Sequence, residues 1–193
     1  MNPAESDIAS LVQVINKLQK RMRRYDPYLY GSELLTRYIL IDPLLRALGW
    51  DTEDPQKVWV DFRVEDGRKR SADYVLFSSK RMVTLIEAKS YGGTWTDGKF
   101  LNALYQVASY RVTSTETLGK VKVPLGIVTD GEGWYVYSLH SRSPIKRRRT
   151  ILEFCLPPEG SPEEKVTEVA IKALDLSSTR ITSLARKARK SGG

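Results

Sequence analysis

The composition of this 193-residue chain is typical of a folded, basic protein. Hydrophobic residues make up 41% and charged residues 28% of the sequence, a balance that argues against disorder. The 31 basic residues outnumber the 23 acidic ones and give a formal net charge of +8, which favours a polyanionic partner such as nucleic acid. Cys155 and His140 are each the single residue of their type. An intramolecular disulfide is therefore excluded, and a Cys/His zinc site or a serine-protease triad is disfavoured.

The sequence predicts an intracellular, cytoplasmic protein without a membrane partner. It contains no apolar run of membrane-spanning length, and its N-terminal stretch MNPAESDIAS lacks the basic start and apolar segment of a secretory signal. A lone cysteine also suits a reducing compartment.

Hydrophobic periodicity predicts helices at both ends of the chain and strands between them, hence one α/β domain over 1–193. We expect an N-terminal helix within 1–26, a core over about 31–156 and a C-terminal helical extension over 161–190. Within the core, further helices are expected at 32–48 and 101–110. Strands are expected at 58–64, 71–77, 82–89, 125–129, 134–139 and 151–156.

Several helix boundaries carry local signals. Asp26-Pro27 predicts a turn after the first helix, and Ser32 is the expected N-cap of the second. Pro43 should kink or interrupt this second helix before Gly49 ends it. Ser161 is the expected cap of the C-terminal helical region.

Two carboxylates and a lysine are expected to converge in the central hairpin. Glu87 and Lys89 are two residues apart in a strand, so their side chains leave the same face. Antiparallel pairing about the Ser78–Arg81 turn brings Asp73 close to facing Glu87. A divalent cation with oxygen ligands, Mg²⁺ or Mn²⁺, would relieve their repulsion, and the Ala88 carbonyl is a further candidate ligand. Such a site suits phosphodiester hydrolysis, with Lys89 orienting water or stabilising the developing charge.

Three more residues are candidates from neighbouring helices. Glu33, in the first turn of the second helix, is expected to reach a metal or its water, although an acidic residue there also simply favours the helix dipole. Gln106 and Tyr110 are one helical turn apart and share a face, from which they would bind water, phosphate or Lys89. Partly buried helix positions are the alternative for both.

In this order the motifs resemble the PD-(D/E)xK nuclease superfamily, and most closely the N-terminal nuclease domain of type I restriction enzyme R subunits. The resemblance covers roughly Gly31 to Leu139. It rests on Glu33, Leu48-Gly49-Trp50, Arg70-Ser-Ala-Asp73-Tyr74-Val-Leu76, Ile86-Glu87-Ala88-Lys89, Gln106, Tyr110 and Thr129-Asp130-Gly131-Glu-Gly-Trp134. Ala72 stands where the superfamily often has proline. The R subunits continue into an ATP-driven motor, so we expect a small stand-alone member.

The resemblance implies a restriction endonuclease-like fold, with a mixed central β-sheet flanked by helices. It also implies Mg²⁺ dependence, with Mn²⁺ as a substitute, and DNA as substrate. The expected activity is that of an endonuclease, and restriction-like, junction-specific and structure-specific cleavage stay open. A homodimer is expected, because coordinated cutting of two strands needs two active sites. A non-catalytic DNA-binding module of the same fold is the alternative.

Basic residues outside the carboxylate cluster are candidates for contact with the nucleic acid. Lys99 and the run Lys146-Arg147-Arg148-Arg149 are expected to contact phosphate, although a solvated loop is an even alternative for the run. Gly93 to Phe100 nearly matches a phosphate-binding loop, but Phe100 replaces the hydroxyl residue that binds Mg²⁺. A nucleotide-binding protein is therefore the less favoured alternative, and no nucleotide cofactor is expected. Trp50 and Trp134 are expected in the core.

Overall fold

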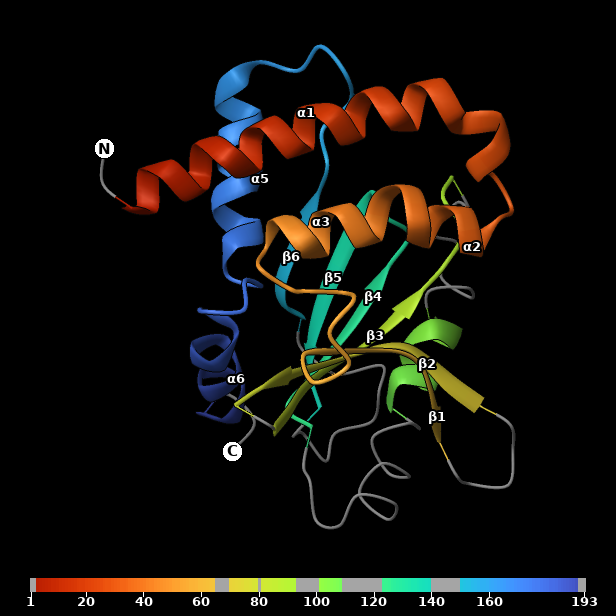
Figure 1. Cartoon of the computed structure of the whole chain (residues 1–193), viewed down its shortest axis with the longest axis vertical. Helices are drawn as coiled ribbons and strands as arrows, with labels where there is room; N and C mark the ends of the chain where they lie inside the picture. The colour runs from red at the N-terminus through yellow and green to blue at the C-terminus, as the bar shows by residue number, and fades with distance from the viewer. Residues whose placement is uncertain are drawn as a thin grey trace.

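A six-stranded mixed β-sheet forms the centre of the computed structural model, which describes residues 3–64, 70–79, 81–92, 101–108, 123–139 and 150–190 (Figure 1). The strands lie in the sheet in sequence order. Their bounds are β1 Val58–Val64, β2 Arg70–Ser78, β3 Arg81–Ala88, β4 Leu125–Thr129, β5 Gly133–Ser138 and β6 Thr150–Cys155. Neighbouring strands are antiparallel except β3 and β4, which are parallel. The predicted α/β class with a mixed central sheet is confirmed.

Helices cover both faces of the sheet. The described helical segments are α1 Pro3–Leu29, α2 Glu33–Thr36, η1 Arg37–Ile41, α3 Asp42–Ala47, residues 101–108, α5 Glu163–Leu174 and α6 Ile181–Lys190. Residues 101–108 pack on one face, whereas α1, η1, α3, α5 and α6 share a core with the other face. In Figure 1, α1 runs across the top of the molecule, and α5 and α6 follow one another along one side of the sheet.

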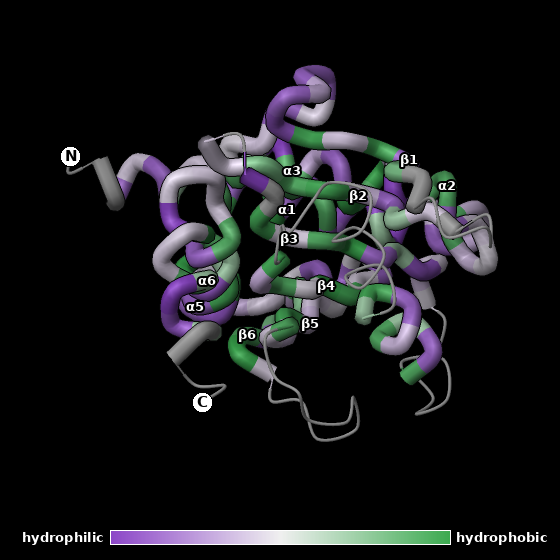
Figure 2. The backbone as a smooth tube through the Cα atoms, turned by 90° about the horizontal axis from the view of Figure 1, so that it is seen from below, coloured by the Kyte–Doolittle hydropathy of each residue, from purple (hydrophilic) through white to green (hydrophobic). Residues whose placement is uncertain are grey.

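The central strands are apolar because both of their faces are buried. Leu85 on β3 and Val128 on β4 point into the core beneath residues 101–108, whereas Ile86 and Ile127 point into the opposite core. Figure 2 shows these strands largely in hydrophobic colours, while α5 and α6 carry both kinds of residue. Trp134 is also fully buried, as predicted.

The first helix is longer than the sequence predicts. The prediction of a turn at Asp26-Pro27 is wrong, because α1 continues to Leu29 and includes Pro27. The apolar stripe of α1 extends to the fully buried Leu29, and burial of such a side chain stabilises by about 1.5–3 kcal/mol. That gain offsets much of the cost of a proline in the last turn of the helix.

A π-helical turn interrupts the second predicted helix. Ser32 caps α2 as expected, since its side chain accepts a hydrogen bond from the backbone N–H of Leu35 at 3.3 Å. The interruption comes at η1, which ends directly before α3, and Pro43 lies in the first turn of α3. Gly49, with φ of +81°, then ends the helical region as predicted.

The C-terminal helices are tied to the core by polar contacts. Trp50 is buried as expected, and its indole N–H donates to the carbonyl of Leu176 at 2.9 Å. The prediction that Ser161 caps the next helix is wrong, because Pro162 holds the N-cap position without a side-chain hydrogen bond. The Pro162 carbonyl instead accepts from the N–H groups of the first turn.

Within the part of the chain that the structure describes, each helix is too short or too polar to span a membrane.

Residues 101–108 approach the sheet closely at Gly126, and this contact generates a stability prediction. A Cβ at Gly126 would lie 2.4 Å from Cγ1 of Val107 and 3.1 Å from Cδ2 of Leu139. We expect Gly126→Ala to lower the free energy of unfolding by about 1–3 kcal/mol, as overpacking does. Urea denaturation measures the change. In the Val107→Ala background the same substitution should cost markedly less, and an equal cost in both backgrounds would contradict this packing.

Candidate active site

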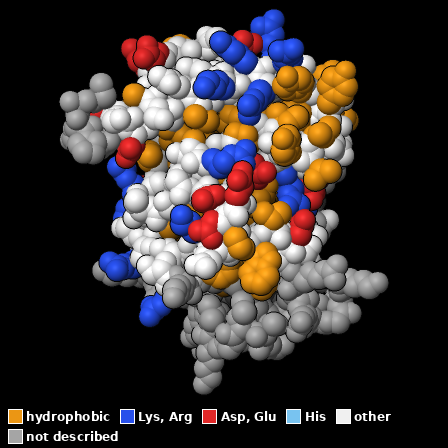
Figure 3. Space-filling view, viewed as in Figure 1, with side chains coloured by type: hydrophobic (Ala, Val, Ile, Leu, Met, Phe, Trp, Pro, Cys, Tyr) orange, Lys and Arg blue, Asp and Glu red, His pale blue; other side chains and the backbone are white. Residues whose placement is uncertain are grey.

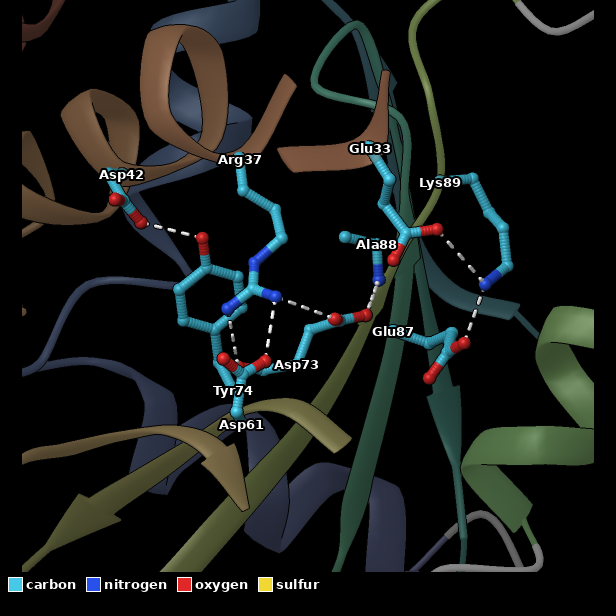
Figure 4. Close-up of polar contacts among 9 residues, drawn as sticks. All are labelled: Glu33, Arg37, Asp42, Asp61, Asp73, Tyr74, Glu87, Ala88 and Lys89. Carbon is cyan, nitrogen blue, oxygen red and sulfur yellow. Dashed lines mark hydrogen bonds and ion pairs between the residues drawn. The ribbon is translucent and has the colours of Figure 1, made fainter. Parts of the chain in front are cut away.

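The charged residues predicted from the sequence gather at the C-terminal end of β3. Glu87 lies on β3 and Lys89 directly after it, while Asp73 lies on the neighbouring strand β2 and Glu33 begins α2 (Figure 4). Because β3 and β4 are parallel, their C-terminal ends meet at this edge, and the backbone N–H of Lys89 donates to the carbonyl of Thr129 at 2.8 Å. Ends of parallel strands commonly carry the functional groups of α/β folds.

The pairing of β2 and β3 fixes Asp73. Tyr74 pairs with Ile86, which brings Asp73 to the level of Glu87 and Ala88. One oxygen of Asp73, Oδ2, accepts a hydrogen bond from the backbone N–H of Ala88 at 2.7 Å. The carboxylate is therefore held against the strand whose end carries the other charges.

Lys89 links the remaining two carboxylates. Its ammonium lies 2.6 Å from Oε1 of Glu87 and 3.7 Å from Oε2 of Glu33. Glu87 is 4% exposed, and its second oxygen, Oε2, is buried with no hydrogen-bond partner among the described residues. A buried carboxylate oxygen without a partner is costly unless a proton or a cation neutralises it.

The hydrogen bonds of Thr36 place α2 beside this strand end. Thr36 is fully buried, and its hydroxyl accepts from the backbone N–H of Tyr91 at 2.9 Å while donating to the carbonyl of Ser32. The loop after β3 is thus attached to α2, so that Glu33 in its first turn lies near Lys89.

Arg37 is a site residue that the sequence analysis missed. It is the first residue of η1, and its guanidinium donates to Oδ1 of Asp73 at 3.0 Å and to Oδ1 of Asp61 at 2.8 Å. The Arg37 and Asp73 side chains are only 12% and 11% exposed. The available signal was its spacing of four residues from Glu33, but the π-helical turn that begins at Arg37 has no clear sequence signature.

Arg37 is itself held by neighbouring groups. Its guanidinium lies 4.9 Å from the centre of the Tyr74 ring, and the Tyr74 hydroxyl donates to Asp42 at 2.6 Å. Asp61 adopts a φ of +51°, which is unusual for a residue other than glycine. Asp61 is the exposed partner in the ion pair between Arg37 and Asp61.

Burial and like charge shift the pKa values of the two central carboxyls. Burial raises the pKa of Asp73 to about 6, against the lowering effects of the Ala88 hydrogen bond and of Arg37. Burial likewise raises the pKa of Glu87 to about 7; Lys89 opposes this shift, while Asp73 adds to it. Burial lowers the pKa of Lys89, but Glu87 and the other carboxylates outweigh it, so the pKa lies above its ordinary value. Lys89 therefore stays charged at neutral pH.

Asp73 and Glu87 are the described carboxylates that could hold a divalent cation at this strand end. The network drawn in Figure 4 has more acidic than basic side chains. The acidic ones are Glu33, Asp42, Asp61, Asp73 and Glu87, and the basic ones are Arg37 and Lys89. Among the described residues, no three His, Cys, Asp or Glu side chains form a group that could hold a metal. Mg²⁺ nevertheless often takes only one or two carboxylates and completes its shell with water and phosphate oxygens.

The other predicted site residues divide into two groups. Gln106 lies half-buried on residues 101–108, the segment that packs on the Leu85 and Val128 face of the sheet. Its role, like that of the Ala88 carbonyl, stays a prediction. The remaining candidates lie outside the described residues. They are Lys99, Tyr110, Lys146, Arg147, Arg148 and Arg149, together with the Gly93–Phe100 loop.

The pKa of Glu87 generates a prediction for metal-free protein. Its folded value of about 7 lies above the ordinary 4.5, so the stability that the protonated carboxyl contributes is lost as pH rises through this interval. Glu87→Gln removes the titration. In EDTA, the variant should therefore gain stability relative to the unmodified protein between about pH 5 and about pH 8, measured by thermal unfolding.

Glu168→Gln is the matched control for this titration. The exposed Glu168 carboxylate is bonded to Lys172, which lowers its pKa, so its removal should give no gain with rising pH. A difference between Glu87→Gln and the unmodified protein that is independent of pH would contradict the shifted titration of Glu87.

A comparison with protein families relates the strands of this site to a known domain. Residues 57–145 match the family described as type I restriction enzyme R protein N terminus. The matched segment includes Asp73, Glu87 and Lys89 and begins after Glu33. Searches of curated proteins and of solved structures found no significant match. The family match confirms the resemblance predicted from the motifs: this segment is similar to the N-terminal domain of type I restriction enzyme R proteins.

Proposed function

We propose that this protein is a divalent-metal-dependent nuclease that hydrolyses phosphodiester bonds of DNA. The observation that carries the proposal is the convergence of two buried carboxylates, Asp73 and Glu87, with the ammonium of Lys89 at one strand end. The match of this segment to a restriction enzyme family supports the same activity.

In this proposal Asp73 and Glu87 hold Mg²⁺ or Mn²⁺. Oε2 of Glu87 offers a buried lone pair that no described group uses, and the oxygens of Asp73 each keep a second lone pair beside their hydrogen bonds. The cation would supply a Lewis acid for the phosphate and lower the pKa of an attacking water. Glu33, which is 43% exposed at its side chain, would bind a water at the outer side of the site.

Lys89 has two tasks at different stages. Before substrate binds, its ammonium neutralises Oε1 of Glu87 and approaches Glu33. With a cation held by Glu87, the Lys89 ammonium would be free to leave this carboxylate and bind the scissile phosphate. There it stabilises the negative charge that develops as the new P–O bond forms and the bond to the leaving oxygen breaks.

Arg37 is a positioning residue in this scheme. Its guanidinium binds Oδ1 and the backbone carbonyl of Asp73, at 3.0 and 3.4 Å, and so fixes the orientation of that carboxylate. The buried pair also lowers the energetic cost of an ionised Asp73 in the absence of metal. A cation site needs this ionised form.

The overall charge of the chain suits a DNA substrate. A net charge of +8 promotes association with a polyanion, and the basic run Lys146–Arg149 is a proposed phosphate contact. Coordinated cutting of both strands of a duplex requires two active sites, so the proposal includes a homodimer.

Cleavage of a labelled DNA panel tests the activity. The panel comprises linear duplex, supercoiled plasmid, flap, four-way junction and single strand, each with Mg²⁺, Mn²⁺ or EDTA. We expect cleavage with metal and none in EDTA. Glu87→Gln and Lys89→Ala should each lower the rate by about a hundredfold or more, because each removes a group that stabilises the transition state.

Lys165→Ala is the control for lost positive charge, since Lys165 is an exposed residue of α5. It should leave the rate unchanged. If the unmodified protein is inert on the whole panel and binds DNA in a salt-dependent way, the non-catalytic binding module is correct instead.

Metal binding itself has a separate readout in thermal unfolding. A ligand that binds only the folded state stabilises it by RT ln(1 + c/Kd) at a free ligand concentration c, so the melting temperature rises with the logarithm of the ligand concentration once that concentration exceeds Kd. Mn²⁺ should therefore raise the melting temperature of the unmodified protein and of Glu168→Gln. The double variant Asp73→Asn/Glu87→Gln should show no such rise, and an equal rise in all three proteins would place the cation elsewhere.

A further inference from the structure

A groove between α1 and the η1–α3 segment lies outside the carboxylate site. Its volume is about 660 Å³. Three of the residues that line it are basic, namely Lys17, Arg21 and Arg46, and none of its described lining residues is acidic. Among the described residues, these three cations have no carboxylate within salt-bridge distance. The groove is therefore complementary to an anion.

Hydrogen bonds hold two of these cations at the wall of the groove and leave donors free. Arg21 of α1 donates from Nη1 to the carbonyl of Ile39 in η1 at 3.1 Å, and Arg46 donates from Nη1 to the hydroxyl of Thr52 at 2.9 Å. A guanidinium has five N–H donors, so each retains several for a phosphate. Lys17 adds a mobile point charge on the same side.

Tyrosines line the same groove and continue beyond it. Tyr25 and Tyr38 belong to the lining, and Tyr28 lies one helical turn after Tyr25 on α1. Tyr28, Tyr30 and Tyr38 are 68%, 69% and 70% exposed. Exposed aromatic residues that are gathered together, unlike singly scattered ones, often mark an interaction site.

Basic and aromatic side chains lie next to one another on this face. In Figure 3, blue basic and orange hydrophobic side chains gather over α1 and its C-terminal end, in the upper part of the view. Tyr30 extends the aromatic surface toward the carboxylate site, because a Cβ at Gly92 would lie only 3.3 Å from its ring. Gly92 follows Lys89 by three residues.

We propose that the groove and the exposed tyrosines bind a single strand of DNA and guide it toward the site of Glu87 and Lys89. The cations bind successive phosphates, and the tyrosine rings stack on unpaired bases. This combination of a basic groove and aromatic platforms is how proteins bind single strands, whose bases are exposed, whereas a duplex buries its base faces. The inference rests on the proposed function, since it names an unpaired strand, free or within a flap or junction, as the part of the DNA that the nuclease holds outside its active site.

Equilibrium binding in EDTA tests the inference without cleavage. The probes are a fluorescent dT oligonucleotide of about 16 nucleotides, an abasic oligonucleotide of equal length and a blunt duplex. We expect dT to bind at least about tenfold more tightly than either of the other two. Tyr28→Ala and Tyr38→Ala should each weaken dT binding by about tenfold and leave abasic binding unchanged.

The cations have their own variant and control. Lys17→Gln/Arg46→Gln should weaken all three probes and lower the salt dependence of binding. Lys165→Gln/Arg180→Gln makes the same charge change at exposed positions elsewhere, and Ile171→Ala removes an exposed apolar side chain from α5. Both control proteins should bind like the unmodified protein.

Several results would overturn the inference. These are equal affinity for dT and abasic strands, tighter binding of duplex, or equal losses in the control proteins. Dissociation of a dimer by the tyrosine variants with dT binding unchanged would assign the surface to a second copy of the chain instead. Loss of cleavage in Glu87→Gln with intact tyrosine-dependent binding would leave both proposals standing. Tyrosine-dependent binding by a protein that cleaves nothing would overturn the nuclease alone.

Discussion

Two carboxylates buried at the end of a β-hairpin impose the main constraint on this structure. Burial raises the pKa values of Asp73 and Glu87 to about 6 and about 7, so ionising them in the folded protein is costly without nearby positive charge. Arg37 supplies that charge to Asp73 and Lys89 supplies it to Glu87. Even so, Oε2 of Glu87 keeps no described partner. Such residual cost is common where binding or catalysis, and not stability, has determined the residues.

The sheet and the helices bring these groups together from separate parts of the chain. Antiparallel pairing of β2 with β3 places Asp73 next to the strand that carries Glu87, and parallel pairing of β3 with β4 makes their ends a shared edge. The buried hydroxyl of Thr36 then connects α2 to the loop after β3. Each connection uses backbone or buried groups, so the geometry of the site depends on the core and on few exposed contacts.

The short helical region from α2 to α3 contacts two surfaces with different chemistry. Arg37, at the start of the π-helical turn, faces the carboxylates, while the next residue, Tyr38, lines the basic groove against α1. A π-helical turn has more residues per turn than an α-helix, so it changes which side chains share a face. Adjacent residues thereby face the proposed cleavage site and the proposed strand-binding groove.

Local chemistry determined much of this protein from its sequence alone. Alternating and helical periodicity predicted the strands and the α/β class, and the spacing of Asp73, Glu87 and Lys89 predicted their convergence, because side-chain direction in a hairpin follows from residue number. The continuation of α1 through Pro27 and the role of Arg37 were decided only by tertiary structure. Both depend on contacts between residues distant in sequence. Burial of Leu29 in the core outweighs the local turn signal at Asp26-Pro27. The buried Asp73 carboxylate needs a nearby cation, and packing of η1 on the sheet places Arg37 there.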